Sequence, residues 1–327
     1  MALTIVVTTS YPRAAGDAEG HFVGAEVRRL CEHGDVTVLA PGSGRQGLWS
    51  ERVVSLGGGE AFGFPGALER LRESPTRLLP AAQFVWRAAR WLRQARQPAR
   101  VIAHFALPCG VPIATRGLAG RRAELEVVCH GSDVRLWARL PGRSLLAREL
   151  LLSPARLRFV SAELRETLLA SLPPAQSALL ALRSRIEPSP FDLDGVPDKT
   201  RARAELGLDR ELKLAVVVAR LIAGKRVDVA LEACSRVRSL EVIVIGDGPE
   251  RAALARRFPE VRFLGQVERP LALAHIAAAD ALVSASRDEG APTVIREARA
   301  LGTPVVCLAA GDLRNWARTD PGLAVVD

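Results

Sequence analysis

Short runs of apolar residues alternate with helical patterns along the whole of this 327-residue chain. The first half holds six such runs, at 3–10, 35–40, 52–56, 99–105, 124–130 and 157–162. A second series lies at 212–221, 240–246, 261–265, 279–286, 303–309 and 323–327. Strands that are apolar on both faces are typical of a parallel sheet covered by helices on each side. The pattern therefore predicts an α/β protein with two doubly wound, Rossmann-like domains.

A change in composition marks the expected domain boundary. The segment 185–200, RIEPSPFDLDGVPDKT, is rich in proline and aspartate and poor in apolar residues, which is typical of a linker. We therefore expect a first domain at 1–184, a linker at 185–200 and a second domain at 201–327. Ligands of doubly wound sheets bind outside the carboxyl ends of the strands. With two such domains, we expect the functional site in a cleft between them.

The charge of the chain is unevenly distributed. Residues 1–190 contain 25 arginines against 16 acidic residues and so account for the whole net charge of +9, while the remainder of the chain is balanced. Such an excess predicts a negatively charged partner for the first half, which could be an anionic membrane surface, an acidic acceptor or nucleic acid. The alternative is a general preference for arginine, since the chain has only three lysines.

The cysteines and the first residues indicate the cellular compartment of the protein. Five scattered cysteines without a Cys-x-x-Cys pair predict buried free thiols in a reducing compartment and argue against a zinc site. The opening MALTIVVTTSYP lacks a basic leader and a cleavage site, so it is predicted to form a strand. No apolar run is long enough for a transmembrane helix. We therefore expect a cytoplasmic protein.

Two cations follow the strand at 212–221. Arg220 and Lys225 flank a short loop that contains Gly224. At the mouth of a crevice they could hold a pyrophosphate, Arg220 through its planar fork and Lys225 as a point charge. Ordinary surface cations are an equal alternative on this stretch alone. Gly248, in the turn GDGPE after the strand at 240–246, is a weaker candidate for a phosphate contact, because such a turn is as often purely structural.

The stretch RDEGAPTVIREARALGTPVV, residues 287–306, places two glutamates eight residues apart. If a helix begins near Glu289, Glu289 and Glu297 share one helix face. Glu289 is suited to accept hydrogen bonds from sugar hydroxyls, and Glu297 to bind a diol such as the two ribose hydroxyls. The start of the helix can present its backbone to a phosphate through Gly290, Ala291, Pro292 and Thr293. The alternative is a pair of carboxylates on a solvated helix face.

The first half offers fewer candidates. His130, in CHGSDV, ends a strand beside a glycine and can donate a hydrogen bond to an oxygen in a crevice. The loop after the first strand contains Gly16 and Gly20, which let its backbone approach a ligand closely. The remaining histidines have weaker contexts and are predicted to be structural or solvated; they are His21, His33, His104 and His275.

These motifs together resemble glycosyltransferase family 4. The resemblance is closest in VVVARLIAGKRVDVALEA, in VIGDGPERAAL and in the segment from VRFLGQVERP to ALGTPVV, which contains a Glu-x7-Glu motif. It is looser in the first half, where CHGSDV and FVSAELRETL match. Members of this family are retaining, nucleotide-sugar-dependent enzymes of the GT-B fold, in which two Rossmann-like domains face each other across a cleft.

The resemblance implies a role for most of the candidates. Arg220 and Lys225 match the pair that holds the donor diphosphate, and Glu297 matches the glutamate on the ribose. Glu289 and His130 match the residues at the reacting sugar, so they are the predicted catalytic residues. The segment 265–267, which ends at Val267, matches the loop that meets the nucleobase. Gly16 and Gly20 fall on the acceptor side. The implied reaction needs no metal and no cofactor besides the nucleotide diphosphate sugar as co-substrate.

Two departures from the family leave other functions open. Relatives continue beyond the last strand with further helices, so we expect a second domain whose sheet lacks part of its cover. Ala291 stands where relatives more often have an aromatic residue or a glycine, which leaves the donor sugar open. A truncated, non-catalytic nucleotide-sugar-binding protein and another GT-B activity such as an epimerase therefore remain alternatives to a transferase in glycolipid, polysaccharide or other glycoconjugate synthesis.

The segment from Arg77 to Arg100 has six arginines and no acidic residue. At helical spacing, Phe84, Ala88 and Leu92 form part of an apolar stripe, while Trp86 falls among arginines. A solvated helix face explains this equally well, but many members of the family act on lipid-linked acceptors. We therefore expect peripheral binding to an anionic membrane surface through this helix. We expect no binding to nucleic acid, because the arginines belong to no recognisable module.

Overall fold

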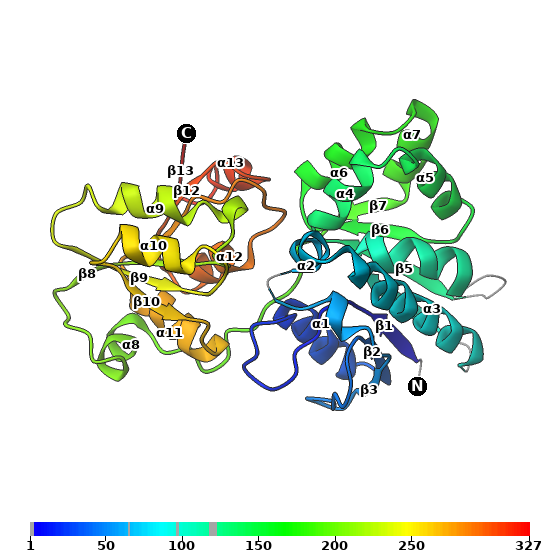
Figure 1. Ribbon diagram of the computed structural model, residues 1–327, viewed down its shortest axis with the longest axis horizontal. Coiled ribbons are helices and arrows are strands. Elements are labelled where there is room, and N and C mark those ends of the chain that lie inside the picture. The colour runs from blue at the N-terminus through cyan, green and yellow to red at the C-terminus, as the bar shows by residue number, and fades with distance from the viewer. Residues whose placement is uncertain (1–2, 65, 96–97, 118–122) are drawn as a thin grey trace. The chain divides into compact units, whose positions relative to one another are not determined.

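The computed structural model describes residues 3–64, 66–95, 98–117 and 123–327, and it divides into two compact units, Met1–Pro190 and Phe191–Asp327 (Figure 1). The division falls inside the segment expected to be a linker. The first residues of that segment belong instead to a short strand of the first unit, β7 (Ser184–Ile186), whose backbone pairs with β6 (Arg156–Phe159).

The first unit is built on a seven-stranded sheet in the order β3-β2-β1-β4-β5-β6-β7, with every neighbouring pair parallel. The other strands are β1 (Thr4–Val7), β2 (Val36–Ala40), β3 (Arg52–Ser55), β4 (Arg100–His104) and β5 (Glu124–Cys129). They coincide with the predicted apolar runs, and their central residues are buried as a sheet covered on both faces requires. The order reverses between β1 and β4, which makes that edge of the sheet the expected place for a ligand.

The connections of the first unit are helices. The longer ones are α1 (His21–Cys31), α2 (Ala67–Glu73), α3 (Leu78–Gln94), α4 (Ser132–Arg139), α5 (Arg143–Leu151), α6 (Ala162–Ala170) and α7 (Pro174–Leu182). Short or irregular turns are η1 (Gly59–Ala61), η2 (Pro75–Arg77), η3 (Ala106–Gly110) and η4 (Ile113–Gly117). Helix α6 begins where it does because the Ser161 side chain accepts a hydrogen bond from the Leu164 amide, which satisfies one of the free donors of the first turn.

The second unit has a six-stranded parallel sheet in the order β10-β9-β8-β11-β12-β13. Its strands are β8 (Lys213–Val218), β9 (Leu240–Ile245), β10 (Arg262–Gly265), β11 (Ala281–Ser284), β12 (Val305–Leu308) and β13 (Leu323–Val326). Its helices are α8 (Lys199–Glu205), the turn η5 (Ala223–Lys225), α9 (Val227–Cys234), α10 (Arg251–Arg257), α11 (Arg269–Ala278), α12 (Thr293–Ala300) and α13 (Leu313–Trp316). The order reverses between β8 and β11.

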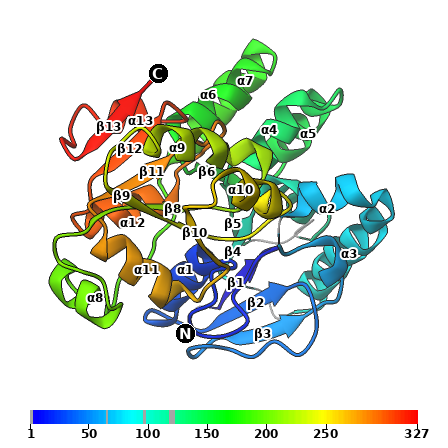
Figure 2. The same cartoon turned by 60° about the vertical axis from the view of Figure 1, so that its left-hand side comes forward.

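The sheet of the second unit separates two apolar clusters, because successive side chains of a strand point to opposite faces. Leu214 and Val216 of β8 pack with residues of α8, α11 and α12, whereas Ala215 and Val217 pack with residues of α9 and α10 (Figure 2). On this second face β12 and β13 are less well covered, since Val306 is 38% and Val326 is 47% exposed.

The helix α3 confirms the predicted apolar stripe. Phe84, Ala88 and Leu92 are buried against the first unit, and the opposite face is exposed. Trp86 is 58% exposed, and the Arg90 guanidinium lies 5.4 Å from the centroid of its ring. Of the six arginines counted in the sequence, Arg96 lies outside the described residues.

Candidate functional site

The carboxyl ends of β8 and β11 hold the residues predicted to bind a diphosphate sugar. These two strands are neighbours, and the strand order of the second unit reverses between them. Arg220 and Lys225 lie in the loop after β8, and Glu289 lies in the loop after β11. The backbone joins the two loops, because the Arg287 amide donates a hydrogen bond to the Gly224 carbonyl at 3.1 Å. The fold therefore brings these three charged residues to one edge.

Lys225 and Glu289 form an ion pair at this edge. The Lys225 Nζ atom lies 2.5 Å from Glu289 Oε1, and the two side chains are only 20% and 14% exposed. Burial alone would raise the pKa of the Glu289 carboxyl, but the Lys225 ammonium and, more weakly, the Arg220 guanidinium outweigh burial and lower it. Glu289 is therefore ionised at neutral pH and retains oxygen lone pairs for hydroxyl donors.

Glu289 and Glu297 do not share a helix face, because the condition that a helix begins near Glu289 is not met. Helix α12 begins at Thr293, with Pro292 as its capping residue, so Glu289 lies in the preceding loop. Glu297 is 4% exposed and forms an ion pair with Arg269, whose Nη1 atom lies 2.6 Å from Glu297 Oε1. Arg269 also donates to the backbone carbonyl of Asp192 at 2.7 Å. Glu297 is thus held in a buried polar contact and is no carboxylate on a solvated face.

The loop before α12 is closely packed. Gly290 and Pro292 are buried, and Ala291 and Thr293 are partly exposed. The carbonyl groups of Glu289 and Gly290 lie so near Gly311, in the loop after β12, that a Cβ atom there would approach them to 2.8 and 2.9 Å. The backbone that leads into the first turn of α12 is therefore held in a fixed position, as a site for phosphate at a helix N-terminus requires.

Gly248 and Val267 have structural roles in the same unit. A Cβ atom at Gly248 would lie 2.3 Å from the Leu221 carbonyl oxygen, so glycine is required for the loops after β8 and β9 to pack together. Val267 follows β10 and packs against the apolar cluster on the α11 side. Neither observation tests a contact with a donor nucleotide.

In the first unit, His130 is paired with a second histidine. His130 follows β5 directly, and its Nε2 atom lies 2.9 Å from Nδ1 of His104, the last residue of β4. The two rings stack at 17° with 5.2 Å between centroids, and Phe22 and Phe105 contact the His130 ring. Burial, the neighbouring histidine and Arg158 all lower the pKa of His130 well below its ordinary value. The ring is therefore neutral at physiological pH.

The prediction that His104 is structural or solvated missed this contact. His104 is completely buried, and burial together with Arg158 lowers its pKa well below the ordinary value. Its Nε2 atom lies 3.9 Å from the Glu26 carboxylate, and Glu26 in turn binds Arg158 at 2.6 Å. The available indication in the sequence was that two consecutive apolar runs have a histidine at or next to their last position, His104 in 99–105 and His130 in 124–130.

Asp133 holds the turn that carries His130. Its carboxylate accepts hydrogen bonds from the backbone amides of His130 and Gly131 at 3.1 and 2.8 Å, and from the Ala106 amide at 2.7 Å. Asp133 is 3% exposed. The motif CHGSDV contained this residue, but its role depends on β4 and β5 being adjacent, which the motif does not reveal.

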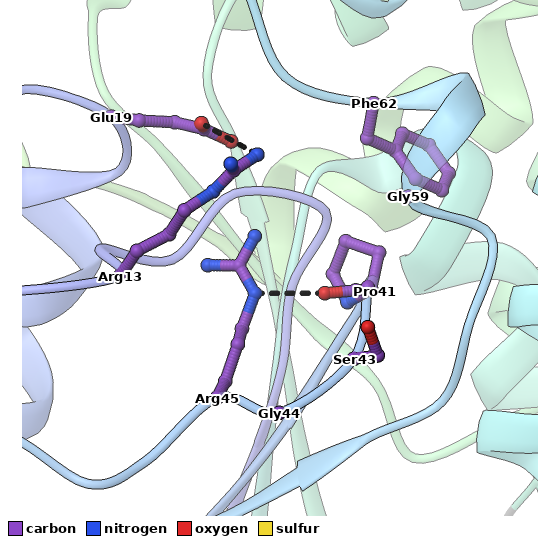
Figure 3. Close-up of a pocket in the computed structure, with 9 residues that line it drawn as sticks. Arg13, Glu19, Pro41, Ser43, Gly44, Arg45, Gly59 and Phe62 are labelled. Carbon is purple, nitrogen blue, oxygen red and sulfur yellow. Dashed lines mark hydrogen bonds and ion pairs between the residues drawn. The ribbon is translucent and has the colours of Figure 1, made fainter.

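The loop after β1 forms one wall of a cavity in the first unit. Gly20 has φ +68°, and a Cβ atom there would lie 2.7 Å from backbone atoms of Ser10 and Tyr11, so only glycine fits. Gly16 also has a positive φ. Between them lies Glu19, which lines a cavity of about 380 Å³ together with Arg13 and Arg45 (Figure 3). The sequence suggested a ligand loop here but did not identify these three charged residues.

Among the described residues, no group of three or more histidine, cysteine, aspartate or glutamate side chains is arranged to hold a metal ion. No helix in the same part of the chain is long and apolar enough to span a bilayer.

Comparison with known proteins shows that the chain is similar to glycosyltransferases. Residues 213–326 match the model of the family described as glycosyl transferases group 1. The chain is 28% identical over 325 residues to TuaC of Bacillus subtilis strain 168, a glycosyltransferase assigned to teichuronic acid biosynthesis, and the match covers 94% of this chain and 81% of that protein.

Solved structures agree on the fold. Sucrose-phosphate synthase of Thermosynechococcus elongatus superposes with a TM-score of 0.68 at 17% identity, over 96% of this chain and 83% of that one. HepE of Anabaena in complex with UDP-glucose gives a TM-score of 0.64 at 15% identity, over 96% and 82%. The fold is therefore that of the GT-B glycosyltransferases. The chain has the GT-B fold, and residues 213–326 of its second unit match the group 1 glycosyltransferases.

Proposed function

We propose that this chain is a retaining glycosyltransferase of family 4 that moves a sugar from a nucleotide diphosphate sugar to an acceptor hydroxyl. The observation that carries the proposal is the Lys225–Glu289 ion pair beside Arg220, at the strand-order reversal of a group 1 glycosyltransferase domain. The solved complex of HepE with UDP-glucose supports a nucleotide sugar as the donor. Synthesis of a glycolipid, a polysaccharide or another glycoconjugate is the setting that we propose.

In this mechanism the bond between the anomeric carbon and the diphosphate breaks while a bond to the acceptor oxygen forms on the same face of the sugar. The proton of the acceptor hydroxyl passes to an oxygen of the departing diphosphate. Arg220 and Lys225 oppose the negative charge that develops on this leaving group, and the N-terminus of α12 adds a favourable dipole. Because these groups supply the positive charge, the mechanism that we propose uses no metal.

Glu289, Glu297 and His130 would orient the donor. Glu289 is ionised and fixed by Lys225, so it can accept hydrogen bonds from sugar hydroxyls without moving. We propose that the Glu297 carboxylate, held by Arg269, accepts a ribose hydroxyl. His130 is proposed to meet the sugar at the reacting centre, a role supported by the family resemblance and by its neutral, fixed ring.

Thermal denaturation with UDP, ADP, GDP and their glucose conjugates tests the donor site. A ligand present at about 100 times its Kd stabilises the folded state by about 2.7 kcal/mol. We expect at least one nucleotide to raise the Tm of the wild type, and Lys225→Ala and Glu297→Ala to abolish the rise. Lys213→Ala is the matched control, because this exposed lysine lies at the start of β8. A rise that persists in both site variants would place the donor elsewhere.

Product analysis separates the alternative functions. An epimerase would convert its nucleotide sugar without an acceptor, and a non-catalytic protein would bind the nucleotide without turnover. The anomeric proton coupling of the product, measured by NMR, reports whether configuration is retained. Inversion would refute the retaining mechanism while leaving the donor site intact.

We propose that α3 brings the protein to an anionic membrane surface. Besides Trp86 and Arg90, its exposed face has Leu78 and Leu79, which are 60% and 66% exposed. Aromatic and aliphatic side chains among arginines are suited to the interface of an anionic bilayer. Flotation with phosphatidylcholine vesicles should require added phosphatidylglycerol and should weaken in Trp86→Ala, but not in Arg148→Gln on an exposed part of α5. Flotation independent of the anionic lipid would exclude this role.

A further inference from the structure

The cavity of the first unit is built at the carboxyl edge of three neighbouring parallel strands. Its walls come from the loops after β1, β2 and β3, which contribute Arg13 and Glu19, the segment from Pro41 to Arg45, and Gly59 with Phe62. Open α/β sheets bind their ligands outside this edge. The cavity volume of about 380 Å³ lies in the range of small-molecule sites.

Arg45 is held in place inside this cavity. Its Nε atom donates to the Pro41 carbonyl at 2.8 Å, and its Nη1 atom donates to the Tyr11 carbonyl. A guanidinium has five N–H donors, so these two bonds fix the orientation of the group without using all of its donors. Figure 3 shows the Arg13 guanidinium directed toward the Glu19 carboxylate, while the Arg45 guanidinium lies below it and is hydrogen-bonded to Pro41.

The charges around the cavity are incompletely balanced. Glu19 lies 3.8 Å from Arg13. Arg70 is also close to the cavity, because its guanidinium donates a hydrogen bond to the carbonyl of the lining residue Phe62 at 2.7 Å. Asp17 is nearby, since it accepts hydrogen bonds from the Arg13 and Glu19 amides. Three arginines therefore face two carboxylates. Burial is the main cause that lowers the pKa of Arg45; attraction by Glu19 opposes it, and repulsion by Arg13 adds to it. Burial raises the pKa of Glu19.

We propose that this cavity binds the anionic group of the acceptor, a phosphate or carboxylate carried by a sugar. The planar fork of Arg45, fixed by two carbonyls, suits two oxygens of such a group, and Arg13 supplies a second cation to the lining of the same cavity. Glu19 and the Ser43 hydroxyl line the same space and can bind hydroxyl groups of the sugar. The proposal rests on the proposed transferase function, because it names the class of acceptor for that reaction.

Isothermal titration tests the cavity without turnover. Glucose, glucose 6-phosphate and glucuronate are compared at constant ionic strength, so that neutral, phosphorylated and carboxylated forms of one sugar size are matched. The variants are Arg13→Gln, Arg45→Gln and Arg45→Lys, with Arg148→Gln as a control outside the cavity. Arg13 is 68% exposed, so its replacement leaves the fold intact even if loss of the two carbonyl contacts of Arg45 weakens the loops.

We expect one of the charged sugars to bind at least about tenfold more tightly than glucose, since one charge-assisted hydrogen bond accounts for that factor. Arg13→Gln and Arg45→Gln should remove this difference, Arg45→Lys should reduce it, and Arg148→Gln should preserve it. The phosphate and carboxylate arms identify which anion is preferred. Equal affinity for all three sugars, or a preference unaffected by Arg13→Gln, would overturn the proposal.

The nucleotide-induced rise in Tm is recorded on the same variants. A normal rise alongside lost sugar binding supports an acceptor site separate from the donor site. Absence of any rise in the wild type counts against the proposed transferase function, and the titration still decides whether the cavity binds anions.

Discussion

The contacts of the histidine pair in the first unit favour one placement of its hydrogens. Nε2 of His104 faces the Glu26 carboxylate at 3.9 Å, which favours the hydrogen on that nitrogen. Nδ1 of His104 then accepts from Nε2–H of His130 across 2.9 Å. This leaves Nδ1 of His130 as a lone-pair acceptor. We infer that His130 accepts a hydrogen bond from a hydroxyl of its ligand, in contrast to the donor role expected from the sequence.

Replacement of His104 tests this arrangement. His104→Phe removes the acceptor, so His130 should lose its single tautomer, and kcat for transfer should fall at least about tenfold while KM for the nucleotide sugar changes little. His104→Gln retains an acceptor oxygen and should restore part of the loss. Nitrogen-15 NMR of the histidine side chains checks the tautomer directly.

His33→Gln is the control for this pair, because His33 is an exposed histidine just after α1. An unchanged His130 nitrogen spectrum in His104→Phe would contradict the arrangement, whatever the activity.

Among the residues of the site, those at strand ends could be predicted and their partners could not. Arg220, Lys225 and Glu289 follow apolar runs, and the rule that ligands bind at strand ends was sufficient to select them. The partners Arg269 and His104 lie 28 and 26 residues away from Glu297 and His130. Recognising those contacts requires the strand order and the helix positions, which local patterns do not contain.

At the scale of elements, the loops after β8 and β9 beside the proposed donor site can pack together only because Gly246 and Gly248 are glycines. A Cβ atom at Gly246 would lie 1.9 Å from the Ala219 carbonyl oxygen, and its φ is +132°. Both the backbone conformation and the close approach therefore require glycine. Gly224 is different, because its Cβ would meet nothing within 4 Å.

We expect Gly246→Ala to lower the free energy of unfolding by more than about 1 kcal/mol, since the native conformation excludes a side chain. Gly224→Ala should change it by less than about 0.5 kcal/mol. Urea denaturation of both variants measures the difference. Equal stabilities would mean that the loops after β8 and β9 can separate without cost.

The apolar runs predicted the strands of both units, with β7 as the exception among the described residues. All the apolar runs became strands, because a sheet buried on both faces needs continuous apolar sequence. The strand β7 was missed because its residues, Ser184 to Ile186, are mostly polar. Helix α12 begins at Thr293 because Pro292 disfavours helical conformation at Ala291.

At the scale of the whole molecule, most of the shifted pKa values of carboxyl groups and histidines are lowered. The pKa is lowered for the carboxyls Glu126, Asp280, Glu289 and Asp320 and for the histidines His104, His130 and His275. It is raised for Glu19 and Asp133 through burial. A group with a lowered pKa in the folded state stabilises the fold above its unfolded pKa and loses this contribution as the pH falls.

The protein should therefore lose stability on acidification in two stages. The contribution of the histidines to stability is lost as the pH falls below their unfolded pKa of about 6.5, and that of the carboxyls as it falls below about 4. Each group contributes at most about 1.4 kcal/mol for each pH unit, and Glu19 and Asp133 offset only part of the total. Urea midpoints measured at pH 8, 7, 6, 5 and 4 check this. A midpoint that stays constant or rises toward pH 5 would contradict the histidine contribution.

Arg269 touches two places with one side chain, the carboxylate of Glu297 and the backbone of Asp192 two residues after the boundary between the units. Arg296 of α12 contacts the same segment, with its guanidinium 4.9 Å from the ring of Phe191. Substitutions aimed at the proposed ribose contact of Glu297 will consequently also disturb residues 191–192, which lead into this half of the chain. Any library that varies Arg269 or Arg296 must therefore measure nucleotide affinity separately from the packing of residues 191–192.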